Sequence, residues 1–104
     1  MKKYRLLKQE VFIILRICTM IEYVPFYDVK KPENYRSTCR VFNKRLMPKR
    51  FAAECALMLT SEQARTVIEL IQCARAECRT KGEFHCHIAV WPEETDAILA
   101  KFLE

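Results

Sequence analysis

The chain has 104 residues and a formal net charge of +5; 51% of its residues are hydrophobic and 30% are charged. This composition is typical of one folded domain over residues 1–104 and excludes a disordered tail and a two-domain enzyme. Gly82 is the single glycine, whereas phosphate-binding loops, dinucleotide-binding turns and nucleophile elbows each need several. The function classes that depend on such loops are therefore excluded.

The positive charge is concentrated in one segment. Residues 1–29 carry a net charge of +2, residues 30–50 carry +7, and residues 51–104 carry −4. Such an asymmetry indicates a surface for a polyanion or for an acidic protein. The alternative is a solvated loop whose charges only keep the chain soluble.

Hydrophobic and cysteine patterns indicate the compartment. The apolar run over residues 11–21 is interrupted by Arg16, so it predicts neither a signal peptide nor a membrane-spanning helix. We expect a cytoplasmic (intracellular) protein with no membrane partner. In a reducing compartment most cysteines stay free and behave as small buried hydrophobes. The chain has six: Cys18, Cys39, Cys55, Cys73, Cys78 and Cys86.

The amino-terminal segment, residues 5–24, fits two patterns. As a helix it places apolar side chains at spacings of four and three: Leu7, Val11, Ile14, Cys18 and Ile21. As a strand it places mostly β-branched side chains on one face: Val11, Ile13, Leu15, Ile17, Thr19, Ile21 and Tyr23. We favour the helix, and Pro25 ends either element.

Residues 33–46 pose the same choice. As a helix they carry an apolar stripe of Tyr35, Cys39, Phe42 and Leu46 and a basic stripe of Arg36, Arg40 and Lys44. The competing interpretation is an edge hairpin, with a strand over 38–42 and a turn leading to Phe51, because edge strands are often rich in Lys and Arg. In either case we expect Phe42 and Phe51 to lie in the core.

The second half gives firmer local signals. Residues 51–59 form a short apolar run that predicts a buried strand, and Thr60 can cap a helix over 61–79. We expect Gly82 to end this helix in a left-handed conformation.

Two further elements are predicted after Gly82. Alternating apolar residues predict a strand over 84–91 that pairs with 51–59, and Pro92 opens a helix over 93–103. The predicted fold class is α+β: a small two-layer single domain with a helical or mixed N-terminal half followed by a β-α-β-α tail.

One cluster holds zinc-ligand residue types: Cys73, Cys78, His85, Cys86 and His87. Paired knuckle spacing is absent, and on the predicted strand Cys86 faces away from both histidines. The predicted geometry still allows a zinc site formed by Cys78, His85, His87 and a distant fourth ligand. We expect instead that Cys78 and Cys86 lie in the core and that the histidines face outward.

No catalytic arrangement is recognisable. Nucleophilic catalysis needs a nucleophile and a base within hydrogen-bond reach and an oriented oxyanion site, and the sequence has no recognisable Cys/His motif. The expectation is a non-enzymatic protein with no catalytic residue, no metal and no cofactor.

The remaining signal is basic residues interleaved with aromatics in the segment 30–50. Lys and Arg neutralise phosphates, and aromatic faces stack on unpaired bases. The candidate binding residues are Lys30, Lys31, Arg36, Arg40, Lys44, Arg45, Lys49, Arg50 and Tyr35. We predict a small basic binding protein that contacts nucleic acid, RNA or DNA, or a nucleoprotein assembly.

The alternative function is a protein–protein interaction module, such as a small inhibitor or an assembly subunit. It would use the same basic patch on an acidic protein surface, or the apolar amino-terminal helix on a larger complex.

Overall fold

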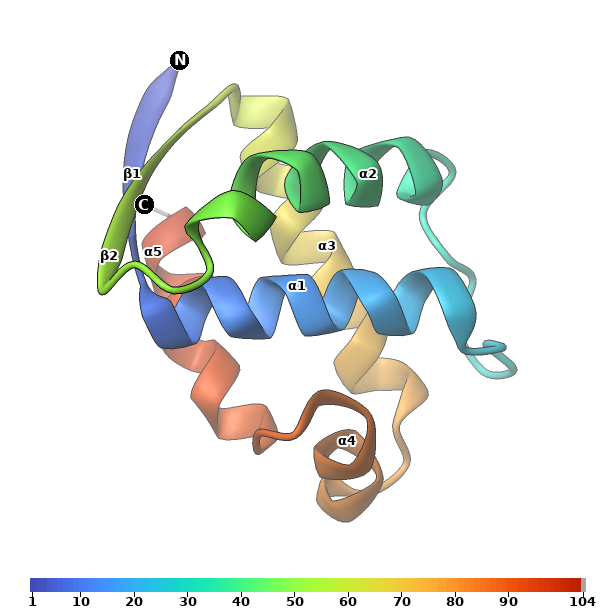
Figure 1. Cartoon of the computed structure of the whole chain (residues 1–104). Coiled ribbons are helices and arrows are strands. Elements are labelled where there is room, and N and C mark those ends of the chain that lie inside the picture. Colours follow the sequence, from blue (N-terminus) through green and yellow to red (C-terminus); the bar gives the residue numbers. More distant parts are fainter. Residues whose placement is uncertain (104) are drawn as a thin grey trace.

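The computed structural model describes residues 1–103 and contains a mixed α+β fold (Figure 1). Within this range a two-stranded antiparallel sheet accompanies five α-helices. The elements in chain order are β1 (Lys2–Leu7), α1 (Lys8–Tyr23), α2 (Tyr35–Leu46), the 3₁₀ turn η1 (Met47–Lys49), β2 (Glu54–Leu59), α3 (Ser61–Glu77), α4 (Lys81–Ile88), the 3₁₀ turn η2 (Pro92–Thr95) and α5 (Asp96–Leu103). In residues 1–103 no helix is both long and apolar enough to cross a membrane.

The central element is α1, which lies between α2 and α4 and crosses α3 (Figure 1). The helical interpretation of the amino-terminal segment is confirmed, although residues 2–7 before it form a strand. At the start of the helix the Glu10 carboxylate accepts a hydrogen bond from the Leu7 N–H at 2.8 Å. The helix ends at Tyr23, because Val24 precedes Pro25 and adopts an extended backbone.

The helical interpretation of residues 33–46 is confirmed for 35–46. Cys39, Phe42 and Leu46 are buried, as the apolar stripe predicts. The helix begins at Tyr35, whose N–H donates to the Pro32 carbonyl at 3.1 Å. The buried face of α2 packs against α1, so its opposite face is left to solvent.

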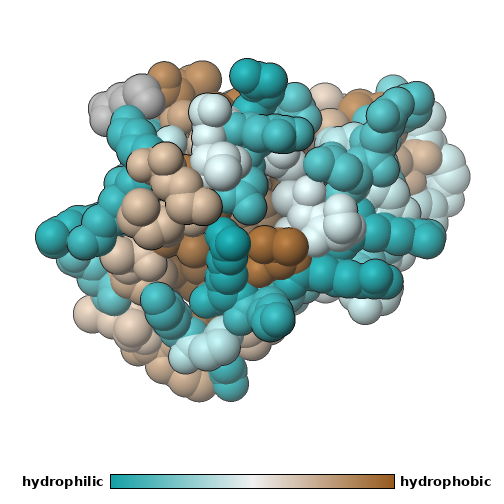
Figure 2. Space-filling view, turned by 90° about the horizontal axis from the view of Figure 1, so that it is seen from above, coloured by the Kyte–Doolittle hydropathy of each residue, from teal (hydrophilic) through white to brown (hydrophobic). Residues whose placement is uncertain are grey.

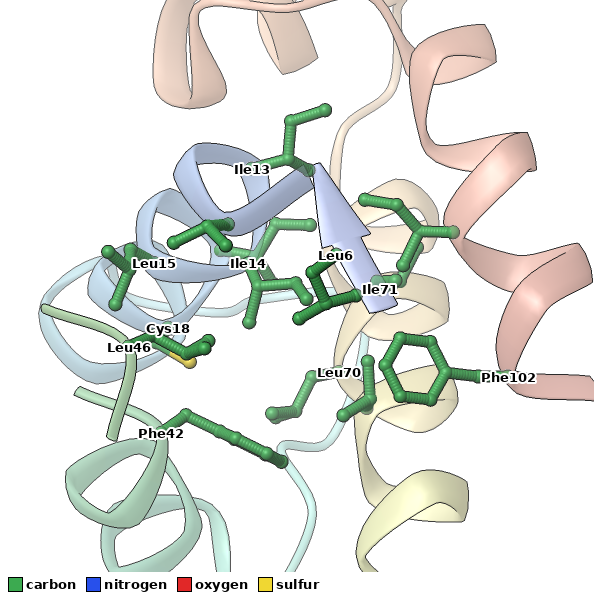
Figure 3. Close-up of a cluster of buried hydrophobic side chains, with 14 of the residues drawn as sticks. Leu6, Ile13, Ile14, Leu15, Cys18, Phe42, Leu46, Leu70, Ile71 and Phe102 are labelled. Carbon is green, nitrogen blue, oxygen red and sulfur yellow. The ribbon is translucent and has the colours of Figure 1, made fainter. Parts of the chain in front are cut away.

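The core is one cluster drawn from all of the helices and from both strands. In Figure 3, Ile14 and Cys18 of α1, Phe42 of α2 and Leu70 of α3 extend into the same interior. Each of these side chains is buried. The hydrophobic burial that stabilises the fold is therefore shared between elements distant in sequence.

The sheet joins the two halves of the chain. β1 and β2 are antiparallel, with Tyr4 opposite Leu57 and Leu6 opposite Cys55, and these four side chains form the buried face together with Leu59. The prediction of a strand over 51–59 is confirmed for 54–59. Its predicted partner is wrong, because β2 pairs with β1 and not with residues 84–91.

The predicted strand over 84–91 is also wrong, because residues 81–88 form α4. The Thr80 hydroxyl caps this helix by accepting a hydrogen bond from the Glu83 N–H at 3.0 Å. Phe84 and Ile88 are buried, whereas Cys86, which we expected in the core, is exposed. A spacing of four fits one face of a strand and one face of a helix equally, and the Thr80 cap favours the helix.

The chain reversals in this region differ from the prediction. Gly82 does not end α3; it lies inside α4 and has no positive φ. α3 ends earlier, at Glu77, and Cys78 is extended. The left-handed residue is Ala89, with φ 67°, at the end of α4. The second half is therefore β-α-α-α and not β-α-β-α.

The helices predicted over residues 61–79 and 93–103 are confirmed as α3 and α5, each with shorter bounds. Thr60 and Gln63 form a reciprocal cap at the start of α3, with hydrogen bonds of 3.0 and 3.1 Å. At the end of the chain, Pro92 opens η2 and α5 follows, with Ile98 and Phe102 buried.

Candidate binding surface

The basic segment 30–50 lies mostly on the surface. Seven of its cations are exposed, and Lys31 is half-buried. The exposed ones are Lys30, Arg36, Arg40, Lys44, Arg45, Lys49 and Arg50. Figure 2, viewed from the side on which α2 lies, shows many hydrophilic side chains on this face, with hydrophobic ones between them near the middle and toward the end that holds β1 and β2. We refer to these eight cations as the basic face, of which Arg45 and Lys49 lie beside β2 and Arg50 lies beside α1.

No cation of the basic face forms an ion pair with a carboxylate of residues 1–103. The ion pairs of this range lie elsewhere: Arg5–Glu54, Arg75–Asp96, Arg79–Asp28, Lys81–Glu93 and Lys101–Glu10. Glu33 is the single acid of the segment 30–50. The charge of the basic face is therefore not neutralised by the fold.

The regular part of this surface is the basic stripe of α2, formed by Arg36, Arg40 and Lys44. All three are exposed, because the opposite side of the helix carries Cys39 and Phe42 into the core. At 1.5 Å per residue the stripe extends over about 12 Å.

Tyr35 supports two cations at the amino-terminal end of α2. The ammonium of Lys31 lies 5.1 Å from the ring centroids of both Tyr35 and Phe26, and the Arg36 guanidinium lies 5.6 Å from that of Tyr35. The Arg36 Nε also donates to the Tyr35 hydroxyl at 3.0 Å. Through these contacts Tyr35 positions the side chains of Lys31 and Arg36.

The loop before α2 is held by one buried carboxylate. Glu77 of α3 accepts hydrogen bonds from the backbone N–H groups of Tyr27, Asp28 and Val29 at 2.5, 3.0 and 2.9 Å. Three consecutive donors around one carboxylate form an anion-binding backbone nest. Glu77 thereby fixes the segment that leads into the basic face.

The other end of the basic face is the turn after α2. The Arg50 Nη1 donates to the Met47 carbonyl at 2.6 Å, and its guanidinium lies 4.6 Å from the centroid of the Phe51 ring. The expectation that Phe51 lies in the core is wrong, because its side chain is 75% exposed. Phe42, by contrast, is buried as expected.

A groove of about 620 Å³, which we call the α1 groove, lies between α1 and this turn. Its apolar lining residues are Phe12, Leu15, Met47 and Phe51, and its polar ones are Lys8, Gln9, Arg16, Thr19 and Arg50. The sequence analysis missed it. The available signal was Phe12, a large apolar residue midway between Lys8 and Arg16 on the polar face of the predicted helix.

The six cysteines and two histidines are spread over α1, α2, β2, α3, α4 and the turn after α3. No three His, Cys, Asp or Glu side chains of this range are placed to hold a metal ion. Burial, and secondarily Glu83 and Glu77, raise the pKa of Cys78 to about 11. A hydrogen bond with Cys39, together with burial, raises the pKa of Cys18. An activated nucleophile needs a lowered pKa together with access to solvent, and Cys39, whose pKa is lowered by the hydrogen bond with Cys18, is fully buried.

Comparison with protein-family models, with curated proteins and with solved structures finds no match to this chain.

Proposed function

We propose that this protein is a non-enzymatic nucleic-acid-binding protein and that the basic face is its binding surface. One observation carries the proposal: in the described chain, none of the eight cations of residues 30–50 has a carboxylate partner, and seven are exposed. Cations that are not neutralised within the fold keep their charge for phosphate groups, and each phosphate contact releases condensed counterions.

The arrangement of the basic stripe suits a phosphate backbone. Arg36 and Arg40 carry planar guanidinium groups, which bind phosphate oxygens with two parallel hydrogen bonds, and Lys44 adds a point charge. Because the stripe lies on a helix whose other face is buried, binding requires no unfolding of α2. The surface is thus already ordered before a partner arrives, which lowers the entropic cost of binding.

Exposed aromatic rings at the two ends of the basic face favour single strands over duplex. Tyr27 is 83% exposed beside the loop before α2, and Phe51 is 75% exposed after η1. Stacking of an unpaired base on such a ring contributes about 1–3 kcal/mol. Bases within a duplex are already stacked and offer no free face.

The histidines and thiols support a role without catalysis. The His85 ring stacks on Trp91 with centroids 4.3 Å apart, and Cys18 and Cys39 are fully buried. Cys78 is half-buried and has a raised pKa. Cys86 is exposed on α4 between His85 and His87, but within residues 1–103 no hydrogen bond joins its thiol to either histidine ring, as a nucleophile and its base would require.

The test is direct titration of the protein with single-stranded RNA, single-stranded DNA and duplex DNA of equal length at one low ionic strength. The triple variant Arg36→Glu/Arg40→Glu/Lys44→Glu lowers the formal net charge from +5 to −1, since each reversal removes two units. A matched control, Lys3→Glu/Lys8→Glu/Arg65→Glu, makes the same change at exposed cations outside the basic face that form no ion pair within residues 1–103.

We expect the wild type and the control to bind the single strands and the basic-stripe variant to lose binding at least a hundredfold. Equal losses in both variants would mean that only net charge matters and would reject the assigned surface. Absence of binding to all three nucleic acids by the folded wild type would reject the function itself. An acidic protein partner would then be the better explanation of the basic face, because it too is attracted by unpaired cations.

A further inference from the structure

We propose that the α1 groove is a docking site for an acidic amphipathic helix of a partner protein. This inference concerns the exposed side of α1 and does not rest on nucleic-acid binding, although the groove shares Arg50 with the basic face and Phe51 with the proposed stacking rings. It is carried by the shape of the groove, by its apolar floor and by the charge of its rim.

The shape of the groove matches a helix. From Lys8 to Thr19 its wall follows α1 for about 16 Å, or three helical turns, at 1.5 Å per residue. Along this strip α1 is uncovered, whereas α2 and α4 cover it on either side (Figure 1). A helix laid in the groove would pack on α1 as its neighbours do, with its own side chains between those of α1.

The apolar side chains of the groove are exposed to an unusual degree. Phe12 is 40%, Met47 42% and Phe51 75% exposed, while Leu15 is buried at the floor. Large exposed apolar side chains that gather in one place mark an interaction site. Small-molecule pockets bury most of their ligand, and a groove whose wall includes the exposed Phe51 is too open for that. Helix-in-groove recognition uses such open troughs.

The rim of the groove selects for negative charge. Lys8 and Arg16 lie on the α1 side and Arg50 on the side of the turn, and no carboxylate of residues 1–103 lines the groove. Arg16 donates to the His87 carbonyl at 2.9 Å and Arg50 to the Met47 carbonyl at 2.6 Å. Each guanidinium has five N–H donors, so both are held in place with donors left for a partner's carboxylates.

These features define the occupant. Its apolar residues recur at spacings of three and four, to contact Phe12, Met47 and Phe51. Its flanks carry Asp or Glu, and two of them seven or eight residues apart match Lys8 and Arg16, which are about 12 Å apart along α1.

The test uses a displayed library of 18-residue helical peptides with a fixed Leu stripe and flanking positions randomised among Glu, Lys and Ser. Peptides are selected on the full-length wild type, and their affinity is then measured for Phe12→Ser/Phe51→Ser and for the control Leu103→Ser, which changes an exposed apolar residue on α5. Circular dichroism melting curves check that both variants fold.

The expected result is enrichment of Glu at the flanks, with affinity at least tenfold weaker for the groove variant and unchanged for the control. The variant Arg36→Glu/Arg40→Glu/Lys44→Glu should retain the selected peptides, and Phe12→Ser alone, which leaves the Phe51 ring in place, should weaken the peptides and retain nucleic-acid binding. The two proposals therefore fail separately.

Three results would overturn the docking site. The first is enrichment of Lys or Ser in place of Glu, or no enrichment at all. The second is equal loss of affinity in the Leu103→Ser control. The third is a wild-type dimer in sedimentation that Phe12→Ser/Phe51→Ser dissolves, which would assign the groove to a second copy of this chain.

Discussion

The basic segment and the carboxyl-terminal helices use their cations in opposite ways. In α3, α4 and α5, ion pairs join Arg75 to Asp96, Lys81 to Glu93 and Lys101 to Glu10. In α2 and η1, the cations have no carboxylate partner within residues 1–103. Among the described residues, each cation of the first region except Arg65 has a carboxylate partner, whereas in the second the cations make contacts only with carbonyl or hydroxyl groups and aromatic rings, and their charge is not neutralised.

The difference concerns how much each group of cations contributes to the stability of the fold. Exposed ion pairs contribute little to stability, so the paired cations mainly orient neighbouring elements. Unpaired cations concentrated on one ordered helix repel one another and cost stability unless a partner neutralises them. Substitutions on the buried face of α2 should therefore cost far more stability than substitutions on its exposed face.

The largest expected effect is the difference in stability cost between substitutions on the buried and the exposed face of α2. Phe42→Ala removes a fully buried ring from the core and should lower the free energy of unfolding by about 3–5 kcal/mol. Arg40→Ala, two positions away on the exposed face, should change it by less than about 0.5 kcal/mol. Urea unfolding followed by circular dichroism measures both. A loss above 2 kcal/mol for Arg40→Ala would show that the basic stripe is structural.

The next effect compares two lysines. Lys101 binds the buried Glu10 carboxylate at 2.5 Å and the Arg5 carbonyl at 2.7 Å. Lys101→Met leaves Glu10 without this cation and should cost about 2 kcal/mol, because a buried charge loses its partner. Lys44→Met should be nearly neutral. Urea unfolding measures the free-energy change of both variants. Equal costs would contradict the contrast between paired and unpaired cations.

The thiols give a smaller effect that depends on pH. Because burial raises the pKa of Cys78 to about 11, its thiolate fraction, and hence its alkylation rate, should rise about tenfold per pH unit between pH 7 and 10. At pH 7 the exposed Cys86 should react first. Mass spectrometry of iodoacetamide-treated protein gives the order, and faster labelling of Cys78 than of Cys86 at pH 7 would be inconsistent with the fold.

The smallest effect is at the end of α4. Ala89 adopts φ 67°, a conformation that costs a residue with a Cβ about 1 kcal/mol relative to glycine. Ala89→Gly should therefore raise the free energy of unfolding by about that amount. A melting temperature below that of the wild type would indicate that this turn does not adopt the left-handed conformation.

The sequence predicts best the elements whose signals are local. For α3, the Thr60 cap and the apolar spacing lie within the helix itself, and the prediction is right. For residues 84–91, the buried Phe84 and Ile88 satisfy a strand and a helix equally, and the prediction is wrong. The pairing of β2 with β1 joins residues about 50 positions apart, and no local pattern specifies it.

The candidate sites also differ in how far local sequence patterns predict them. Arg36, Arg40 and Lys44 are recognisable from their spacing alone, and the structure exposes them as the helical interpretation predicts. The α1 groove is not recognisable from residue spacing. It forms because the Phe51 side chain lies outside the core and lines the groove together with Phe12. Contacts of that kind depend on the packing of α2 against α1, which composition does not reveal.

The central claim is that the basic stripe binds phosphates, and the salt dependence of binding to single-stranded nucleic acid tests it most directly. The wild type is compared with Arg36→Gln/Arg40→Gln/Lys44→Gln, which removes three charges without adding new ones. If each cation neutralises one phosphate, the slope of log affinity against log salt should be shallower by about 2 in the variant, since each contact to a single strand contributes about 0.7. Equal slopes, or no binding by the wild type at the lowest salt, would contradict the account.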